Sequence, residues 1–323
     1  MNFFWQTVAS LLEKGQNVFL ALVAEHTQHS PGTIGAKLLV AKNHDPVGTI
    51  GGGIMEYKLV KQAGDILERD NYTPEIQTLI HRKSGPGEKS GMICAGKQTN
   101  LYYLCHPEKD GETVERIKRN LENDQSATLT IAPSGMLVKE QQPDVNKPQI
   151  KLSVRENGWL YEEQLLNFKR IAIIGGGHCS LALSRVMKNL GYGVFVYETR
   201  ENVFTITENR YTRSVQIVDD YRDAASLINY PELTNVVVMT TDVDSDVQGL
   251  LGLIDLPSPF IGVMGSQAKI AEILRRLKSE GISEDQLSHL TAPVGTPMTS
   301  NTPEEIAISV AAQILQKRIQ PTN

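Results

Sequence analysis

The sequence is poor in cysteine, which occurs at only three of its 323 positions. These positions are Cys94, Cys105 and Cys179, and no two of them form a C-x-x-C pair. The odd number and the spacing argue against a disulfide framework and against a structural zinc site. The composition therefore indicates free thiols in a reducing compartment.

Long apolar runs and an excess of positive charge are also absent. No segment approaches the roughly 20 consecutive apolar residues that cross a bilayer. The first residues, MNFFWQTVASLLEKG, have no basic side chain ahead of their apolar part and predict an amphipathic helix rather than a signal peptide. The net charge is −5, whereas nucleic-acid surfaces need a clustered positive excess. We therefore expect a cytoplasmic protein with no membrane or nucleic-acid partner.

Two glycine triplets stand out in what the sequence does contain. Gly51–Gly53 lie in 48-GTIGGGIMEY-57, and Gly175–Gly177 lie in 171-IAIIGGGHCSLAL-183. Each triplet follows an apolar run and precedes a helical pattern. Glycine weakens strands and helices alike, because it loses the most backbone freedom on folding. A triplet at such a junction therefore indicates a turn or the close approach of another group.

The pattern of apolar residues changes near residue 165. Before it, helical patterns at 54–69 and 112–123 are mixed with strand patterns, which lie at 18–25, 37–42, 75–81, 99–105, 127–132, 135–139, 149–154 and 158–163. After it, helical patterns alternate with strand patterns, which lie at 170–174, 193–198, 214–218, 235–240 and 259–264. Such alternation predicts a parallel sheet covered on both faces. We predict an α/β chain with a mixed α+β domain at 1–165 and a Rossmann-like doubly wound domain at 166–323.

The second triplet opens a G-x-G-x-x-S motif directly after a predicted strand. In such motifs the first glycine permits a tight turn, the second lets a phosphate approach, and the helix N-terminus offers free N–H groups. Glu198 ends the next strand, where a carboxylate can bond a ribose hydroxyl. We expect His178, at the helix start, to be a neutral hydrogen-bonding group. The motif is compatible with NAD(P) binding and equally with a nucleotide-type fold whose site is altered.

The first triplet is compatible with a tight turn or with an anion cradle made of backbone N–H groups. Glu56 follows it in the first helical turn, where a carboxylate suits the helix dipole. The glycine-rich loop at 81–97 then places cations on both sides of Cys94, among them Lys83, Lys89 and Lys97. Such surroundings favour the thiolate of Cys94 and capture of an anionic ligand. A solvated charged loop is the alternative.

Together these segments resemble the XdhC/CoxI family, the xanthine dehydrogenase accessory proteins. The similar segments span nearly the whole chain in the family's order: 30-SPGTIGAKLLV-40, 47-VGTIGGGIMEY-57, 92-MICAG-96, 173-IIGGGHCSLAL-183, 262-GVMGS-266 and 291-TAPVGTPMTSNTPEEIAISVAAQIL-315. The chain departs from the family pattern at three positions. Gly32 and Gln267 stand where many members have arginine, and Ala95 stands where many have glycine. Each departure removes a contact available to an anion.

The resemblance implies a cofactor chaperone rather than an enzyme. Its cargo would be molybdenum cofactor, as molybdopterin or its dinucleotide form. It would deliver the cofactor to an apo xanthine dehydrogenase-type enzyme, with sulfur supplied through a cysteine desulfurase partner. An NAD(P)-dependent oxidoreductase and a nucleotidyl-transfer enzyme acting on the cofactor are the alternatives, and a homodimer is left open.

The resemblance also suggests which residues bind the cargo. We expect the backbone of Gly51–Gly53, near Glu56, to hold a phosphate with help from Lys83, Lys89 or Lys97. Cys94 would contact the molybdenum or handle its sulfur. Gly175–Gly177, with His178 and Glu198, would hold a second phosphate or a nucleotide, and Ser266 lies in another of the similar segments.

Two acidic stretches have simpler interpretations. Asp242, Asp244 and Asp246 follow a predicted strand, where they could bind Mg²⁺ or cap the next helix, and we favour the cap. The stretch 302-TPEE-305 has the pattern of a capping box followed by a helix.

Overall fold

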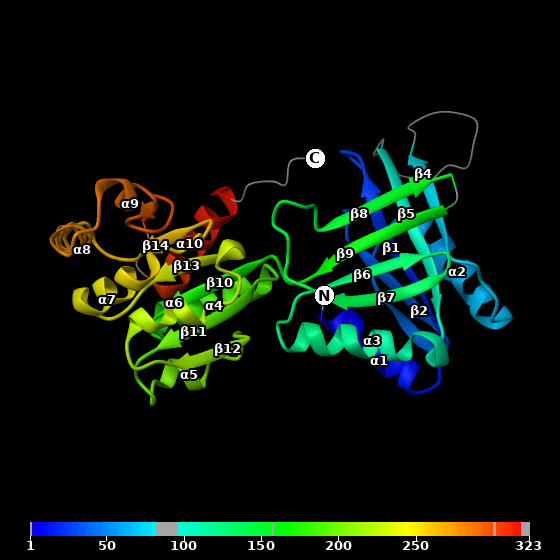
Figure 1. Ribbon diagram of the computed structural model, residues 1–323, viewed down its shortest axis with the longest axis horizontal. Coiled ribbons are helices and arrows are strands. Elements are labelled where there is room, and N and C mark those ends of the chain that lie inside the picture. Colours follow the sequence, from blue (N-terminus) through cyan, green and yellow to red (C-terminus); the bar gives the residue numbers. More distant parts are fainter. Residues whose placement is uncertain (1, 82–95, 157, 300–301, 318–323) are drawn as a thin grey trace. The chain divides into compact units, whose positions relative to one another are not determined.

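The computed structural model describes residues 2–81, 96–156, 158–299 and 302–317. The chain divides into two compact units, Met1–Leu166 and Asn167–Asn323 (Figure 1). None of the helices in these described ranges combines the length and the apolarity needed to cross a bilayer.

The first unit is a mixed α+β structure. Its elements in chain order are α1 (Asn2–Glu13), β1 (Val18–His26), β2 (Lys37–Ala41), β3 (His44–Gly48), α2 (Gly53–Arg69), β4 (Glu75–His81), β5 (Gly96–Cys105), α3 (Pro107–Glu122), β6 (Ala127–Ala132), β7 (Gly135–Glu140), β8 (Ile150–Arg155) and β9 (Gly158–Leu165).

The second unit alternates strands with helices. Its elements are β10 (Arg170–Ile174), α4 (His178–Asn189), β11 (Gly193–Glu198), α5 (Phe204–Thr207), β12 (Ser214–Ile217), η1 (Tyr221–Asp223), α6 (Ala224–Leu227), η2 (Pro231–Leu233), β13 (Thr234–Val238), α7 (Val243–Leu253), β14 (Ile261–Val263), α8 (Gln267–Ser279), α9 (Glu284–Ser288), β15 (Leu290–Thr291) and α10 (Pro303–Lys317).

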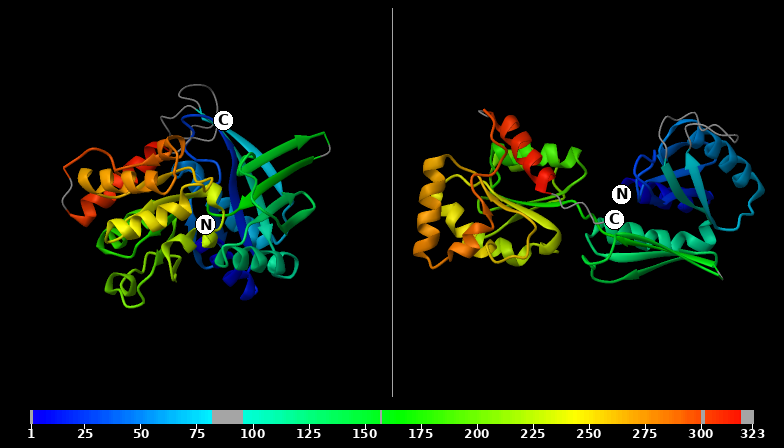
Figure 2. Two further views of the ribbon diagram at one scale, coloured as in Figure 1. Left: turned by 60° about the vertical axis from the view of Figure 1, so that its left-hand side comes forward. Right: turned by 90° about the horizontal axis from the view of Figure 1, so that it is seen from above.

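Two antiparallel sheets form the first unit, with strand orders β3-β2-β1-β5-β4 and β7-β6-β9-β8. Strand β1 is apolar over most of its length because it is buried on both faces. Phe19 and Ala21 pack with α2, whereas Leu20 and Leu22 pack with α1, α3 and the four-stranded sheet. The views from two sides show α2 and the four-stranded sheet on opposite faces of the five-stranded sheet (Figure 2).

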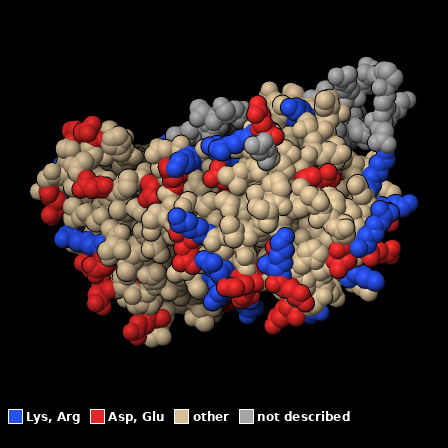
Figure 3. Space-filling view, turned by 45° about the vertical axis from the view of Figure 1, so that its right-hand side comes forward, with Lys and Arg blue, Asp and Glu red and all other residues tan. Residues whose placement is uncertain are grey.

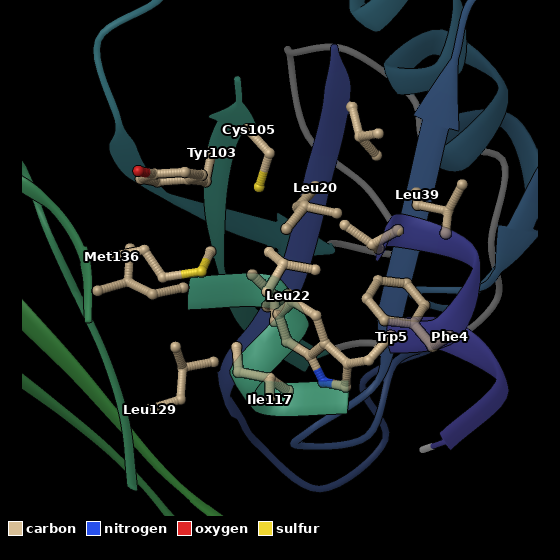
Figure 4. Close-up of a cluster of buried hydrophobic side chains, with 14 of the residues drawn as sticks. Phe4, Trp5, Leu20, Leu22, Leu39, Tyr103, Cys105, Ile117, Leu129 and Met136 are labelled. Atoms are coloured by element: carbon tan, nitrogen blue, oxygen red, sulfur yellow. The ribbon is translucent and has the colours of Figure 1, made fainter. Parts of the chain in front are cut away.

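The larger core of this unit contains a fully buried tryptophan, Trp5, in the same cluster as Leu20 and Leu22 (Figure 4). Cys105 lies in the same cluster and is completely buried. Burial raises the pKa of the Cys105 thiol well above its usual value, because an apolar environment disfavours the charged form. Cys105 is therefore a core residue at the end of β5.

The second unit contains a six-stranded sheet in the order β12-β11-β10-β13-β14-β15, and every neighbouring pair is parallel. Helices α4 and α10 cover one face, and α7 and α8 cover the other. The order reverses between β10 and β13, the position where ligands bind in doubly wound folds. The predicted fold class is thus confirmed: a mixed α+β unit is followed by a Rossmann-like parallel sheet.

Some element boundaries differ from the prediction for local reasons. Helix α3 begins at Pro107 rather than near residue 112, because proline is accepted in the first helical turn and Asp110 accepts a hydrogen bond from the His106 N–H, 2.9 Å away. Strand β2 ends at Ala41 rather than at residue 42, and the turn that follows it contains Asn43, whose φ is 56°. Asparagine accepts this left-handed conformation, so β3 begins at His44.

Candidate functional site

The first glycine triplet turns the chain from β3 into α2 through an unusual backbone conformation. Gly51, Gly52 and Gly53 all have positive φ, at 127°, 73° and 70°. Gly52 precedes the helix with ψ at −165°, a combination that is essentially restricted to glycine. The triplet is therefore required by the backbone, and we call residues 49–53 the first glycine corner.

The donors of the first glycine corner surround an oxygen of Glu56. Its Oε2 accepts hydrogen bonds from Thr49 Oγ1 at 2.7 Å, from the Ile50 N–H at 2.8 Å and from the Gly52 N–H at 3.1 Å. The Gly51 N–H donates to Thr49 Oγ1 at 3.1 Å. The corner thus presents three converging donors to one oxyanion, which here is a carboxylate of the same chain.

Three of the family-like segments meet at this corner. A Cβ added to Gly51 would lie 2.8 Å from the Gly32 nitrogen, and one added to Gly96 would lie 2.7 Å from the Ser30 nitrogen. A Cβ on Gly32 would lie 2.4 Å from the Ile50 oxygen. The backbone is therefore in close contact between three segments, residues 30–32, 49–53 and 96–98. Glycine at positions 32, 51 and 96 allows this contact, because a Cβ there would clash.

The predicted basic residues can be placed only in part. Lys97 lies in β5 beside the corner and has an exposed side chain. Its backbone N–H donates to Thr27 Oγ1 at 2.7 Å. Lys83, Lys89 and Cys94 lie outside the described residues, so their roles remain predictions. Within the ranges that the structure describes, no group of three His, Cys, Asp or Glu side chains is arranged to hold a metal ion.

The second triplet has a different backbone from the first. Only Gly175 has a positive φ, at 102°, and a Cβ there would lie 2.7 Å from the Met239 oxygen. A Cβ on Gly176 would lie 2.6 Å from Ile206 Cδ1. Gly177 has an ordinary φ of −76° and nothing within 4 Å of an added Cβ. We call residues 175–178 the second glycine corner; it is partly covered by Ile206 of α5.

A buried carboxylate occupies the middle of the second glycine corner. Glu198 Oε2 accepts from the Gly176 N–H and from Arg200 Nη2, both at 2.8 Å, and Oε1 accepts from Tyr221 Oη at 2.6 Å. Burial alone would raise the pKa of Glu198, but bonds from Arg200, Tyr221 and Gly176 outweigh it and lower the pKa to about 2. A ribose hydroxyl would have to displace one of these partners to bond this carboxylate.

Glutamine at position 198 is expected to remove a pH dependence of stability. The native pKa of Glu198, about 2, lies below the usual 4.5, so its stabilisation is complete above pH 4.5 and lost as the pH falls towards 2. Urea unfolding of the parent between pH 6 and pH 2.5 should show a loss of up to ~3 kcal/mol from this group, which Glu198→Gln lacks. The control is Glu272→Gln: hydrogen bonds from Arg275 and Arg276 also lower the pKa of this half-buried carboxyl to about 2, but water screens these surface pairs, so this variant should keep most of the parent's pH dependence. Equal slopes for the parent and Glu198→Gln would contradict the assignment.

The other predicted residues of the second unit lie near the carboxyl ends of its strands. His178 is exposed at the first position of α4. Ser266 caps α8, and its Oγ accepts from the Lys269 N–H at 3.3 Å. Cys179 is partly buried, and this burial raises the pKa of its thiol. The negative charge of the nearby Glu304 raises it further, to a smaller extent. Cys179 is therefore held in the neutral thiol form.

The acidic stretch after β13 stabilises helices. Asp242 caps α7 by accepting from the Ser245 N–H at 2.8 Å, and Asp244 pairs with Arg276. Asp246 is fully buried and pairs with Lys269 Nζ at 2.5 Å. The capping interpretation is confirmed for Asp242 alone, because Asp244 and Asp246 form ion pairs instead. The capping box at 302–305 is also formed, through bonds of 3.1 and 3.3 Å.

Sequence reasoning missed four residues that complete the two corners: Thr49, Gln98, Ile206 and Tyr221. Gln98 had a usable signal, since Gln98, Asn100 and Tyr102 alternate along a strand that ends in an apolar run. Ile206 and Tyr221 had none, because their partners Gly176 and Glu198 are distant in the chain. Thr49 lies beside its partners in the chain, but its residue type alone does not mark it. On the face drawn in Figure 3, the coloured positive and negative side chains are interspersed without a broad area of one sign.

The fold and the corners define a class of protein: an α+β unit with a glycine corner, joined to a Rossmann-like unit. Two family descriptions match it in chain order. The XdhC and CoxI family matches residues 11–77, and the XdhC Rossmann domain matches residues 171–314. Together these matches cover well over half of the sequence. The chain belongs to the XdhC/CoxI family.

Individual relatives agree with this assignment. A Bacillus subtilis protein described as a probable xanthine dehydrogenase component is 23% identical over 344 residues, covering 98% of each chain. Uncharacterized protein YqeB of Escherichia coli K12 is 29% identical over 149 residues, which are 46% of this chain and 27% of that protein. This match thus spans only about a quarter of YqeB. The crystal structure of a xanthine dehydrogenase from Bacillus halodurans has a TM-score of 0.71 at 21% identity, covering 98% of this chain and 97% of that chain, and shows the fold.

Proposed function

We propose that this protein is an accessory factor for a xanthine dehydrogenase-type molybdenum hydroxylase. It binds molybdenum cofactor, protects it and delivers it, sulfurated, to the apoenzyme. Family membership in both units and the name of the B. subtilis relative support the accessory role. The observation that carries the proposal is the first glycine corner, where three family-like segments meet around three donors aimed at one oxyanion.

Phosphate binding at the first glycine corner follows from its donors. The cofactor carries a phosphate, and a phosphate oxygen can accept the bonds that now go to Glu56 Oε2 from Thr49 Oγ1 and the N–H groups of Ile50 and Gly52. The positive φ values fix these amides before the ligand arrives, so little ordering is needed on binding. The carboxylate of Glu56 has to leave the corner, and it therefore competes with the ligand.

The segment that contains Cys94 is flanked by His81 and Gly96. His81 and Gly96 are paired in register in β4 and β5, and Gly96 packs against Ser30. The chain between them contains Cys94, Lys83 and Lys89, and a thiolate is a ligand that soft metal centres accept. In this proposal the thiol contacts molybdenum or handles sulfur received from a cysteine desulfurase.

The second glycine corner gives weaker support for ligand binding than the first glycine corner does. A dinucleotide placed over Gly176 would meet Ile206, and its ribose would compete with Arg200 and Tyr221 for Glu198. Binding of the nucleotide part of a dinucleotide cofactor there would require α5 to shift. We therefore do not propose an NAD(P)-dependent oxidoreductase or a nucleotidyl-transfer enzyme.

Anaerobic titration with molybdenum cofactor tests the proposed function. Cys94→Ser is expected to weaken binding roughly tenfold, equivalent to about 1.4 kcal/mol. The matched control Cys179→Ser should bind like the parent, because that thiol is neutral and lies in the other unit. Glu56→Gln should bind more tightly, since a competing negative charge is removed from the corner. Equal affinities for the parent, Cys94→Ser and Glu56→Gln would remove the site assignment.

A further inference from the structure

A buried glutamine connects the segments that meet at the first glycine corner. Gln98 is 0% exposed, and its side chain makes four hydrogen bonds. Nε2 donates to the Ile50 oxygen at 2.9 Å, while Oε1 accepts from the Gly32 N–H and from Ser30 Oγ, both at 3.0 Å. A single carboxamide therefore joins residues 30–32 to residue 50.

The orientation of this carboxamide is fixed by its neighbours along β5. Gln98 Nε2 also donates to Asn100 Oδ1 at 2.8 Å, and Asn100 Nδ2 donates to Tyr102 Oη at 3.2 Å. These side chains alternate on one face of the strand and are all buried. The ring of Tyr102 in turn stacks on Phe19, with centroids 5.9 Å apart. The carboxamide cannot rotate without leaving buried polar groups unpaired, which is costly.

Gln98 also accounts for glycine at position 32. A Cβ there would lie 2.4 Å from the Ile50 oxygen and 2.7 Å from Gln98 Oε1. The backbone at 32 therefore occupies the space that a side chain would need, and its N–H reaches the carboxamide directly. In this chain the packing leaves no room at position 32 for a side chain such as the arginine of many family members.

We propose that Gln98 is a positioning residue for the first glycine corner. Its carboxamide holds the Ile50 carbonyl and the 30–32 segment, so that the N–H groups of Ile50 and Gly52 converge on one oxyanion. The expected effect of Gln98 on cofactor binding rests on the proposed function. Its effect on the backbone of the first glycine corner can be measured without a ligand.

Amide hydrogen exchange and cofactor titration of Gln98→Leu test the proposal. The variant should speed exchange at Ile50 and Gly52 as well as at Gly32, and it should weaken cofactor binding, each by roughly tenfold. The matched control is Gln77→Leu, the same change at an exposed residue that pairs with Asn100 in β4. It should alter neither quantity.

Ser30→Ala is the milder second variant, because it removes only the hydroxyl bonds of Ser30 to Gln98 and to the Gly32 oxygen. It should change exchange and affinity in the same direction but less, and it decides the matter if Gln98→Leu does not fold. Unchanged exchange at Ile50 and Gly52 in a folded variant would overturn the positioning role. Failure of the parent to bind cofactor would instead overturn the proposed function, while the exchange result would still decide the role of Gln98.

Discussion

Replacing Gly51 with alanine is expected to destabilise the first unit by about 3 kcal/mol, combining backbone strain with overpacking. The φ of Gly51 is 127°, which a residue with a Cβ rarely adopts. The new Cβ would also lie 2.8 Å from the Gly32 nitrogen and from the Pro31 carbonyl carbon. Both are backbone atoms, so the neighbours cannot rotate away as a flexible side chain would.

Gly64→Ala is the matched control for this change, and we expect the opposite sign. Gly64 lies inside α2, and an added Cβ would have nothing within 4 Å. Alanine there should stabilise the unit by about 0.5–1 kcal/mol, because it restricts the unfolded chain and favours the helix. Urea unfolding followed by circular dichroism measures both variants. Similar small effects for the two would show that the corner is not a fixed backbone structure.

Much of the fold could be predicted from sequence because its signals are local. The run from Val18 to Ala24 is apolar at every position, which is typical of a strand buried on both faces, and β1 is such a strand. The strand, triplet and helix at 170–189 likewise follow a spacing set by neighbours in the chain. Hydrophobic period and glycine position are sufficient to predict elements of this kind.

The corners could be predicted only in part, because their chemistry depends on distant residues. The two triplets are identical in sequence, yet all three glycines need a positive φ in the first and only Gly175 does in the second. Glu198 fitted the ribose-binding pattern, but its pairing with Tyr221 depends on how the sheet and η1 pack. The contacts of Gln98 with Gly32 and Ile50 span 66 and 48 residues, and a local pattern does not encode them.

Removing the charge of Lys37 should be among the most damaging single changes in the first unit. Lys37 Nζ pairs with Glu163 Oε1 at 2.7 Å and donates to the Gly35 oxygen at 3.0 Å. The pair joins β2 of one sheet to β9 of the other, and the Glu163 side chain is 0% exposed. Lys37→Met would leave a buried carboxylate without its cation, which typically costs about 3–5 kcal/mol. It would also remove the bond that Lys37 Nζ donates to the Gly35 oxygen.

Two comparisons separate this pair from a general effect of losing a lysine. Lys42→Met, at an exposed position in the turn after β2, should change the free energy of unfolding by less than about 0.5 kcal/mol. The double variant Lys37→Met with Glu163→Met should be more stable than Lys37→Met alone, because no unpaired charge is then buried. Tyr161 Oη, which donates to Glu163 Oε2 at 2.9 Å, would lose its acceptor, so the recovery should be incomplete. Additive effects of the two substitutions would show that Lys37 and Glu163 contribute independently and that the cation is not needed to hold the carboxylate between the sheets.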